Sequence, residues 1–235
     1  MIIYGRNPVH EAIRGTRTVT SVWAMKNAAR EPWLPARVEI VPADRIEQLC
    51  GSDAHQGICA DVSEFEYADA KALLSGDEPL LVALDEVTDP QNLGAICRSA
   101  ECAGATGVVL PERRSAGVTP AVCKASAGAV EHLPVAIVRN LADWLGEAKQ
   151  AGLWTYGADA GGPLAYDEVD WAGGVVLVLG SEGRGLRPRV AAACDALVSL
   201  PIRGRIESLS VSAAAAVLLY AANSGRGQAG NPQIA

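Results

Sequence analysis

The chain has 235 residues, of which 49% are hydrophobic and 20% are charged, and its formal net charge is −7. This composition supports a packed core and argues against intrinsic disorder. The negative charge argues against a protein that coats nucleic acid uniformly, because neutralising phosphates requires an excess of Lys and Arg. Arginine is nevertheless clustered locally, so RNA binding through small patches remains open; the clusters are Arg113-Arg114, Arg184/Arg187/Arg189 and Arg203/Arg205.

Membrane, secretion and metal signals are missing from the sequence. It has no run of about eighteen uncharged apolar residues, as a membrane span requires. Its first fifteen residues carry charges where a signal peptide needs an apolar stretch. The six cysteines form no C-x-x-C pair, and the three histidines have no metal-ligand spacing. We therefore expect a cytoplasmic protein with reduced thiols and no metal site.

Residues 1–62 predict a small α/β domain. In chain order we expect a helix opened by Asn7-Pro8, a strand over 19–25, an apolar stretch over 38–41, a helix over 45–50 with Asp44 as its N-cap, and a strand over 57–62. The charged stretch over 63–79 contains Gly76 and ends in Pro79, so it predicts a linker.

Residues 80–224 predict a second, larger domain in which strands and helices alternate. We expect strands over 80–87, 107–110, 133–138, 153–156, 174–179 and 196–200, and helices over 93–103, after Thr119-Pro120, over 141–151, 187–193 and 209–223, with Asn92 and Ser208 as caps. This alternation predicts a mainly parallel sheet covered by helices, with ligands beyond the carboxyl ends of the strands. We predict a disordered tail over 225–235.

Three segments at predicted strand ends could carry chemistry. The first, DPQNLGAICRSA, contains Asn92 and Arg98. Helical side chains lean toward the helix N-terminus, so Arg98 could reach back toward Asn92. A guanidinium beside an amide suits an anionic phosphate or a polarised hydroxyl. The alternative is a plain helix cap and a surface arginine paired with Glu101.

The second segment, Gly180–Gly185, follows a strongly apolar run. Its glycines occur as G-x-x-G-x-G, which is not the order of the phosphate-binding loops, and Glu182 would repel an anion. This favours a nucleotide-like ligand without phosphates or with positive charge, such as S-adenosylmethionine; the alternative is a tight structural turn. In the third segment, residues 200–212, Pro201 and Gly204 enforce an irregular turn before a helix that opens with small residues. These residues allow close approach of a ligand or only close packing.

No Ser-His-Asp order, paired-carboxylate motif or metal cluster competes with these segments. His55 is interpreted as structural rather than catalytic, and Glu131-His132 as the edge of a loop.

Taken together, the segments resemble the SpoU branch of RNA 2′-O-ribose methyltransferases, within the SPOUT superfamily. DPQNLGAICRSA resembles the first motif of that family, LGSEGRGL the second and LPIRGRIESLSVSAAAAVLL the third. YGRNPVHEAI at the start and HQGI before Val62 resemble the substrate-binding domain of ribosomal RNA guanosine-2′-O-methyltransferases. The ordered match covers nearly the whole chain.

The resemblance implies an RNA substrate-binding α/β domain over 1–62 and a trefoil-knotted SPOUT α/β methyltransferase domain over 80–224. It also implies a homodimer with active sites at the subunit interface. Cofactor contacts to S-adenosylmethionine would fall on Gly180, Leu200, Ile202 and Leu209. Asn92, Arg98, Glu182 and Ser210 would carry or support the catalytic step. RNA contacts in the first domain would involve Arg6, His55 and Gln56.

The implied activity is methylation of a ribose 2′-hydroxyl, with a guanosine of large-subunit ribosomal RNA as the expected target and transfer RNA as the alternative. The sequence departs from the family at Ser210, because the family usually has Asn directly after the pair that corresponds to Ser208-Leu209. Serine offers one hydroxyl where asparagine offers an amide donor and a carbonyl acceptor. A non-catalytic RNA-binding protein of the same fold is therefore a rival. A dinucleotide-dependent dehydrogenase is disfavoured by the glycine order.

Overall fold

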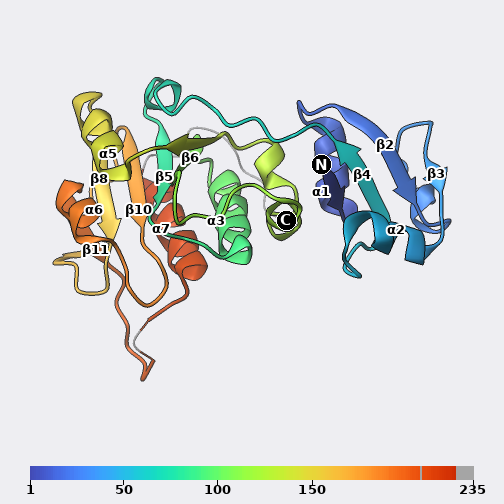
Figure 1. The fold of residues 1–235 in the computed structure, drawn as a ribbon. Helices are drawn as coiled ribbons and strands as arrows, with labels where there is room; N and C mark the ends of the chain where they lie inside the picture. The colour runs from blue at the N-terminus through green and yellow to red at the C-terminus, as the bar shows by residue number, and fades with distance from the viewer. Residues whose placement is uncertain (207, 226–235) are drawn as a thin grey trace. The chain divides into compact units, whose positions relative to one another are not determined.

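The protein is described by a computed structural model that covers residues 1–206 and 208–225 (Figure 1). Its residues group into two compact units. The first comprises residues 1–67, 89–98 and 116–134, and the second comprises residues 68–88, 99–115 and 135 onward. Each unit is therefore built from three separate stretches of the chain. The functional division into 1–62, 63–79 and 80–224 stays a prediction.

The first unit is built on a four-stranded sheet with the order β1-β4-β2-β3. Strand β4 is antiparallel to both β1 and β2, and β3 is parallel to β2. Its elements are β1 (Ile2–Tyr4), α1 (Arg6–Arg14), β2 (Val19–Ala24), η1 (Ala28–Arg30), β3 (Glu39–Ile40), α2 (Ala43–Cys50), β4 (Ile58–Val62), α4 (Pro120–Ala125) and η3 (Ala129–Glu131). The two strands expected from the sequence are present as β2 and β4, and β3 lies in the apolar stretch over 38–41. β1 was not predicted because three residues are too few for a recognisable alternation.

A buried ion pair joins distant segments of the first unit. The guanidinium of Arg17 lies 3.0 Å from Glu131, and these side chains are 7% and 0% exposed. Arg17 also donates to the carbonyl oxygen of Ser63. Glu131 lies at the end of η3, before the connection to β7, but the burial of its side chain was not predicted. An isolated charge cannot be buried at acceptable cost, and local sequence did not reveal its distant partner.

The second unit is built on a seven-stranded sheet with the order β7-β6-β5-β10-β8-β11-β9. Every neighbouring pair is parallel. The elements of this unit are η2 (Ala72–Leu74), β5 (Leu80–Leu84), the end of α3 (Pro90–Cys102), β6 (Gly107–Pro111), β7 (Val135–Val138), α5 (Leu141–Gln150), β8 (Trp154–Ala158), β9 (Leu164–Ala165), β10 (Val175–Leu179), α6 (Pro188–Ala193), β11 (Ala196–Ser199) and α7 (Val211–Gly225).

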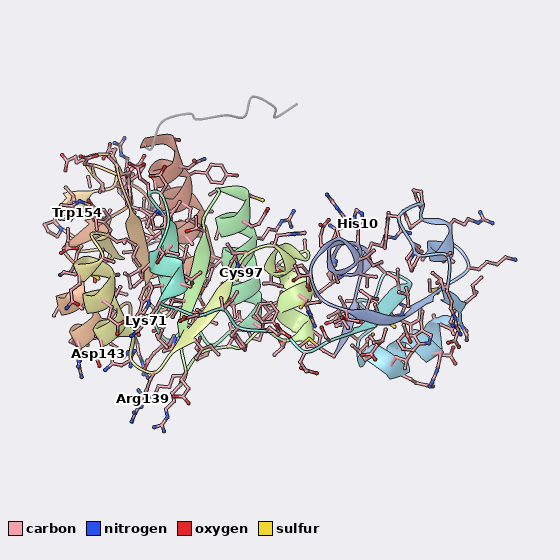
Figure 2. All side chains as sticks on the ribbon, turned by 90° about the horizontal axis from the view of Figure 1, so that it is seen from above. His10, Lys71, Cys97, Arg139, Asp143 and Trp154 are labelled. Atoms are coloured by element: carbon pink, nitrogen blue, oxygen red, sulfur yellow. The ribbon has the colours of Figure 1, made fainter. Side chains whose placement is uncertain are left out.

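The central strands of this sheet are buried on both faces. β5, β6 and β10 consist of buried residues throughout, as the continuous apolar runs predict. One face packs against α5 and α6 through a cluster that includes Leu81, Val178, Trp144 and Val190. Helix α7 contacts β10. Figure 2 shows Arg139, Asp143 and Trp154 at the periphery of the side chains, and Trp154 is 54% exposed. The predicted parallel α/β architecture is confirmed.

Helix caps differ from expectation at three places. Helix α2 has Pro42 at its N-cap position, and Asp44 lies in the first turn. Helix α3 begins at Pro90, where the carboxylate of Asp89 accepts the Gln91 N–H at 3.0 Å, so Asn92 is not the cap. Helix α7 begins at Val211, after the predicted Ser208. Each helix has several polar residues near its start, and only the local backbone geometry decides which one caps it.

Two further boundaries differ from the prediction. The expected strand over 80–87 ends at Leu84, because Glu86 has a φ of 60° that breaks an extended strand. The stretch over 63–79 is ordered in part, since Ala68 forms a bridge to Ala136 of β7 and the Trp144 indole donates to the carbonyl oxygen of Ala70. The tail predicted to be disordered over 225–235 lies outside the described residues, except for Gly225.

Candidate active site at the carboxyl edge of the second sheet

A cavity of about 750 Å³ opens at the carboxyl ends of β10, β8 and β11. This volume lies within the usual range for small-molecule sites. Four stretches contribute to its wall: the loop after β8, the loop after β10, the turn after β11 and the first half of α7. They supply Ala158, Asp159, Ala160, Leu179, Gly180, Ser181, Glu182, Gly183, Arg184, Gly185, Val198, Leu200, Ile202, Ser208, Leu209, Ser210, Val211, Ala214 and Leu218. The cavity lies beyond the carboxyl ends of parallel strands, which is where the sequence predicted a ligand to bind.

The loop after β10 has a tight conformation that requires glycine. Ser181 and Gly185 exchange backbone hydrogen bonds of 3.1 and 2.9 Å across the turn. A Cβ atom on Gly180 would lie 2.1 Å from the carbonyl carbon of Gly185. Gly183 and Gly185 have φ values of +79° and +66°, which glycine adopts most easily. The segment is therefore a tight turn and a cavity wall at once.

The start of helix α7, with Ser210 just before it, forms part of the cavity wall. The Ser210 hydroxyl oxygen accepts the Ala213 N–H at 3.2 Å, so Ser210 itself caps the helix. Its oxygen also lies 3.3 Å from the Ser212 hydroxyl oxygen. Two neighbouring apolar residues, Leu209 and Ile202, are 47% and 40% exposed although they are large. Exposed apolar side chains in a concave wall are typical of a ligand site.

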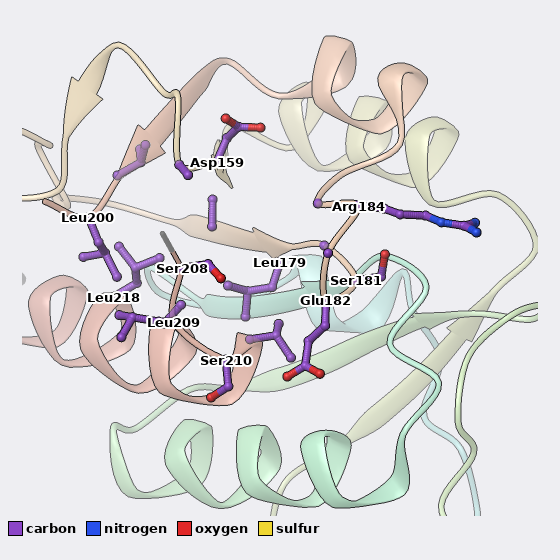
Figure 3. A pocket seen from close by; sticks show the side chains of 18 of the residues that line it. Asp159, Leu179, Ser181, Glu182, Arg184, Leu200, Ser208, Leu209, Ser210 and Leu218 are labelled. Carbon is purple, nitrogen blue, oxygen red and sulfur yellow. The ribbon is translucent and has the colours of Figure 1, made fainter. Parts of the chain in front are cut away.

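The chemistry of the cavity is apolar with acidic and hydroxyl groups. Figure 3 shows Leu179, Leu200, Leu209 and Leu218 gathered in its wall, while the Arg184 side chain extends away from it. The acidic groups in the lining are Glu182 and Asp159. Such a wall suits a ligand with a flat apolar part, hydroxyl groups and positive charge, and suits a polyphosphate poorly.

Six predicted site residues lie together in this wall. They are Gly180, Leu200, Ile202 and Leu209, expected to bind the cofactor, and Glu182 and Ser210, expected to be catalytic. The other two, Asn92 and Arg98, belong to the first part of α3 and so to the first unit. Arg98 is exposed. Within the described residues its guanidinium does not form the alternative ion pair with Glu101 and has no other partner. The roles of all eight residues stay predictions.

The three residues expected to contact RNA lie near the start of α1. Gln56 accepts the backbone N–H of Arg6 at 3.0 Å, and the Arg6 guanidinium lies 2.8 Å from Glu31. His55 is 8% exposed, and its ring nitrogen accepts the Gly57 N–H. His55 and Gln56 therefore both bind backbone, whereas the Arg6 side chain is half exposed and accessible.

Two charged residues near these sites were not predicted. Lys124 of α4 lies beside α1, with its ammonium 6.0 Å from the centre of the Tyr4 ring, and burial lowers the pKa of its ammonium group. Asp159 follows β8 in the cavity wall, where its carboxylate accepts the Gly161 N–H at 2.8 Å. The run TYGAD showed a strand followed by an acid. The neighbouring position of β8 and β10 was needed to bring that acid to the cavity.

Other chemistries find little support. Burial raises the pKa values of Cys59, Cys97 and Cys194 to about 12, so these thiols are poor nucleophiles near neutral pH. Within residues 1–206 and 208–225, no group of three His, Cys, Asp or Glu side chains could hold a metal ion. No described helix is long and apolar enough to cross a membrane.

Comparison with known proteins identifies the family to which the chain is similar. Residues 79–220 match the SpoU rRNA Methylase family, and residues 2–68 match the family described as RNA 2′-O ribose methyltransferase substrate binding. The chain belongs to the SpoU rRNA methylase family. The predicted family is thereby confirmed, and as a member of it the chain is an RNA methyltransferase.

Three similar proteins place the chain within this family. The TrmH family tRNA/rRNA methyltransferase YacO of Bacillus subtilis strain 168 is 37% identical, over 93% of each chain. An AdoMet-bound rRNA methyltransferase from Sinorhizobium meliloti is 26% identical with a TM-score of 0.78, covering 95% of this chain and 86% of that one. The TrmH/SpoU tRNA modifying enzyme of A. aeolicus is 25% identical with a TM-score of 0.56, covering 66% of this chain and 80% of that one.

Proposed function

We propose that the chain methylates the 2′-hydroxyl of a guanosine in large-subunit ribosomal RNA, with S-adenosylmethionine as the methyl donor. The observation that carries this proposal is the cavity, which gathers the glycine loop after β10, the turn after β11 and the start of α7 at one sheet edge. The glycine loop is separated from the other two segments by α6 and β11, and the family resemblance implies donor contacts in each of them.

The lining fits S-adenosylmethionine. Leu179, Leu200 and Leu218 offer an apolar surface for the adenine ring, and Asp159 and Glu182 offer acceptors for hydroxyl groups and positive charge. Gly180 and Gly183 bring backbone close to the cavity without side chains. When bound, the donor would supply a methyl group from its sulfonium centre. A ribose 2′-oxygen would displace S-adenosylhomocysteine from that methyl group.

Asn92 and Arg98 are the residues that we expect to act on the ribose 2′-hydroxyl. A ribose 2′-hydroxyl is a poor nucleophile until its proton is removed or strongly hydrogen-bonded. We assign Arg98 to orient this hydroxyl and assist its deprotonation, helped by a substrate phosphate, and Asn92 to orient the ribose or the loop. The free guanidinium of Arg98 supports this assignment, since no intramolecular carboxylate of the described chain occupies it.

Ser210 has a narrower role than the usual asparagine. Its oxygen accepts the Ala213 N–H, and its single hydrogen can be donated either to the Ser212 hydroxyl at 3.3 Å or to a bound ligand. We propose that Ser210 donates one hydrogen bond in the cavity and that Glu182 supports the same site. Much of the rate would then come from alignment of the reactants rather than from a strong base.

The similarity pattern supports ribosomal RNA as the substrate. The rRNA methyltransferase from S. meliloti resembles this chain over 95% of its length, and the tRNA modifying enzyme of A. aeolicus over 66%. The N-terminal residues 2–68 match a substrate-binding family of their own. Transfer RNA is the alternative substrate, and the cytoplasm is the predicted compartment.

We also propose a homodimer with a trefoil-knotted catalytic domain, as the family resemblance implies. Support for the dimer comes from α7, where Val217 and Tyr220 are 43% and 46% exposed. These side chains lie three residues apart and so on one side of the helix. An exposed apolar helix face is a typical protein interface.

The reaction is tested with Arg98→Ala. We expect methyl transfer from tritiated S-adenosylmethionine to RNA to fall by about 100-fold or more, because the group that prepares the hydroxyl is lost. Donor affinity, measured by calorimetry, should change by less than about twofold. Glu101→Ala, an exposed change one turn further along α3, is the matched control and should retain activity. Wild-type turnover by Arg98→Ala would refute the role of Arg98.

The substrate is tested by mapping 2′-O-methyl marks after incubation of the wild-type protein with deproteinised total RNA. A new mark on a large-subunit guanosine supports the proposal. A mark only on transfer RNA establishes the alternative substrate. Donor binding without transfer to any RNA would favour the non-catalytic rival.

A further inference from the structure

One buried acidic residue binds both ends of the glycine loop, one through its carboxylate and the other through its backbone. Asp85 follows β5, and its side chain is 0% exposed. Its carboxylate accepts two hydrogen bonds from Arg187, from the backbone N–H at 2.8 Å and from Nε at 2.7 Å, and it forms an ion pair with a terminal guanidinium nitrogen at 2.6 Å. These bonds raise the pKa of the Arg187 guanidinium above its usual value. Asp85 is thus fully paired, as a buried charge must be.

The positions of these bonds along the chain are informative. The loop of residues 180–186 starts after Leu179, whose carbonyl oxygen accepts the backbone N–H of Asp85 at 2.7 Å. The loop ends at Arg187, which binds the carboxylate of the same residue. Asp85 therefore holds both ends of the loop, while the Ser181–Gly185 pair holds its interior.

A second acid extends this arrangement to the neighbouring strand. Glu86 lies 3.0 Å from the Arg114 guanidinium and 3.7 Å from Nε of Arg187. Glu86 and Arg114 have φ values of 60° and 59°, which side chains other than glycine rarely adopt. The network joins the loops after β6, β5 and β10, three adjacent strands of the sheet. Backbone of this kind persists only where surrounding interactions hold it, often beside functional sites.

We propose that Asp85 is a positioning residue that acts through Arg187 to hold the loop of residues 180–186 as the preformed wall of the donor cavity. The inference rests on the proposed function, because the ligand of that wall is S-adenosylmethionine. A loop ordered before binding does not lose its conformational entropy when the ligand arrives, so affinity increases. Loss of the Asp85–Arg187 pair should therefore weaken donor binding although neither residue lines the cavity.

The main test is Arg187→Met in the full-length protein. We expect the Kd for S-adenosylmethionine, measured by calorimetry, to rise by about tenfold or more, with a matching rise in KM and a smaller change in kcat. Arg189→Met is the matched control, since Arg189 lies two residues after Arg187, in α6, and the change breaks an exposed pair of 2.7 Å with Asp143 of α5. That variant should bind the donor like the wild type.

Two conservative variants separate positioning from general stability. Arg187→Lys keeps the charge but not the paired nitrogens, so we expect it to recover only part of the affinity. It also replaces Arg187→Met if that variant does not fold. Asp85→Asn should weaken donor binding as well, and in combination with Arg187→Met it should add little, since both changes remove one interaction. Hydrogen exchange of the loop amides should be faster in each weakened variant.

The outcomes distinguish this inference from the proposed function. If the wild-type protein does not bind S-adenosylmethionine, the proposed function fails. If the wild type binds it and folded Arg187→Met or Arg187→Lys binds equally well, only the positioning role fails. A lower free energy of unfolding with unchanged donor affinity would likewise overturn the inference, because the pair would then be only structural.

Discussion

Individual carboxylates in this protein connect segments that are distant in sequence. Asp195 precedes β11, and one of its carboxylate oxygens accepts both the backbone N–H and the hydroxyl of Thr155 at 2.9 and 2.7 Å. Its other oxygen lies 2.9 Å from the ammonium of Lys149. Burial opposes ionisation, but these bonds outweigh it and lower the pKa of the carboxyl group below 3.8. Asp195 thus fixes the start of β8 beside β11.

We expect Asp195→Asn to lower the free energy of unfolding at about pH 7 by roughly 1–3 kcal/mol, because hydrogen bonds to a charged group are lost. A lowered pKa means that this stabilisation is complete above the unfolded value of 3.8 and is lost as the pH falls through the folded value. The difference between variant and wild type should therefore shrink in acid. Urea unfolding across the pH range measures it.

Asp143→Asn provides the control for this measurement. Its carboxylate belongs to an exposed pair with Arg189, and such pairs contribute little to stability. A loss for Asp195→Asn that is no larger than that of Asp143→Asn would contradict the assigned role.

Among the secondary-structure elements and their connections, the loop after β10 depends on the absence of a side chain at Gly180. A methyl group there would meet the backbone of Gly185 at 2.1 Å, and backbone cannot move aside easily. We expect Gly180→Ala to destabilise the protein by about 1–3 kcal/mol through overpacking. It should also weaken binding of S-adenosylmethionine, since the cavity wall must shift. Calorimetry and urea unfolding test both effects.

Gly146 of α5 offers the matched glycine control. A Cβ atom at this position has nothing within 4 Å. Because glycine is unfavourable inside a helix, Gly146→Ala should stabilise the protein by up to about 1 kcal/mol and leave donor affinity unchanged. Equal donor affinity in both alanine variants would show that the close approach at Gly180 does not matter for the cavity.

For the assembled protein, the proposed homodimer predicts the effect of changing α7. Val217→Glu combined with Tyr220→Glu places charge on the exposed apolar face of that helix. Burying two unpaired carboxylates in an interface is costly, so we expect the variant to sediment as a monomer. Analytical ultracentrifugation measures the mass.

Trp154→Ser is the comparison for the dimer test, because it removes another exposed apolar side chain, at the start of β8. It should leave the mass unchanged. A wild-type protein that is monomeric at all accessible concentrations would contradict the proposed homodimer.

The two units of the molecule, defined by contacts, do not follow the order of the sequence. The sequence predicts two successive domains, yet residues 89–98 and 116–134 group with the N-terminal sheet by their contacts. The buried pair of Arg17 and Glu131 is part of that grouping. Contacts of this kind depend on residues over a hundred positions apart, which no local pattern reports.

Local patterns in the sequence were enough to predict the family, the order of most helices and strands and the three chemical segments. Apolar runs predict buried strands, the glycine order disfavours a phosphate loop, and Pro201 with Gly204 predicts an irregular turn. The family resemblance of these segments implied Gly180, Leu200 and Leu209 as donor contacts, and all three line one cavity.

The three-dimensional arrangement was needed to show which of these segments share a wall and what holds them. The sheet order places β10 between β5 and β8, which brings Asp159 to the cavity and Asp85 to the base of the glycine loop. Asp85 and Arg187 are ordinary charged residues in sequence, 102 positions apart. Their partnership arises because pairing between parallel strands is set by packing across the whole sheet, and periodicity along one strand carries no information about its neighbours.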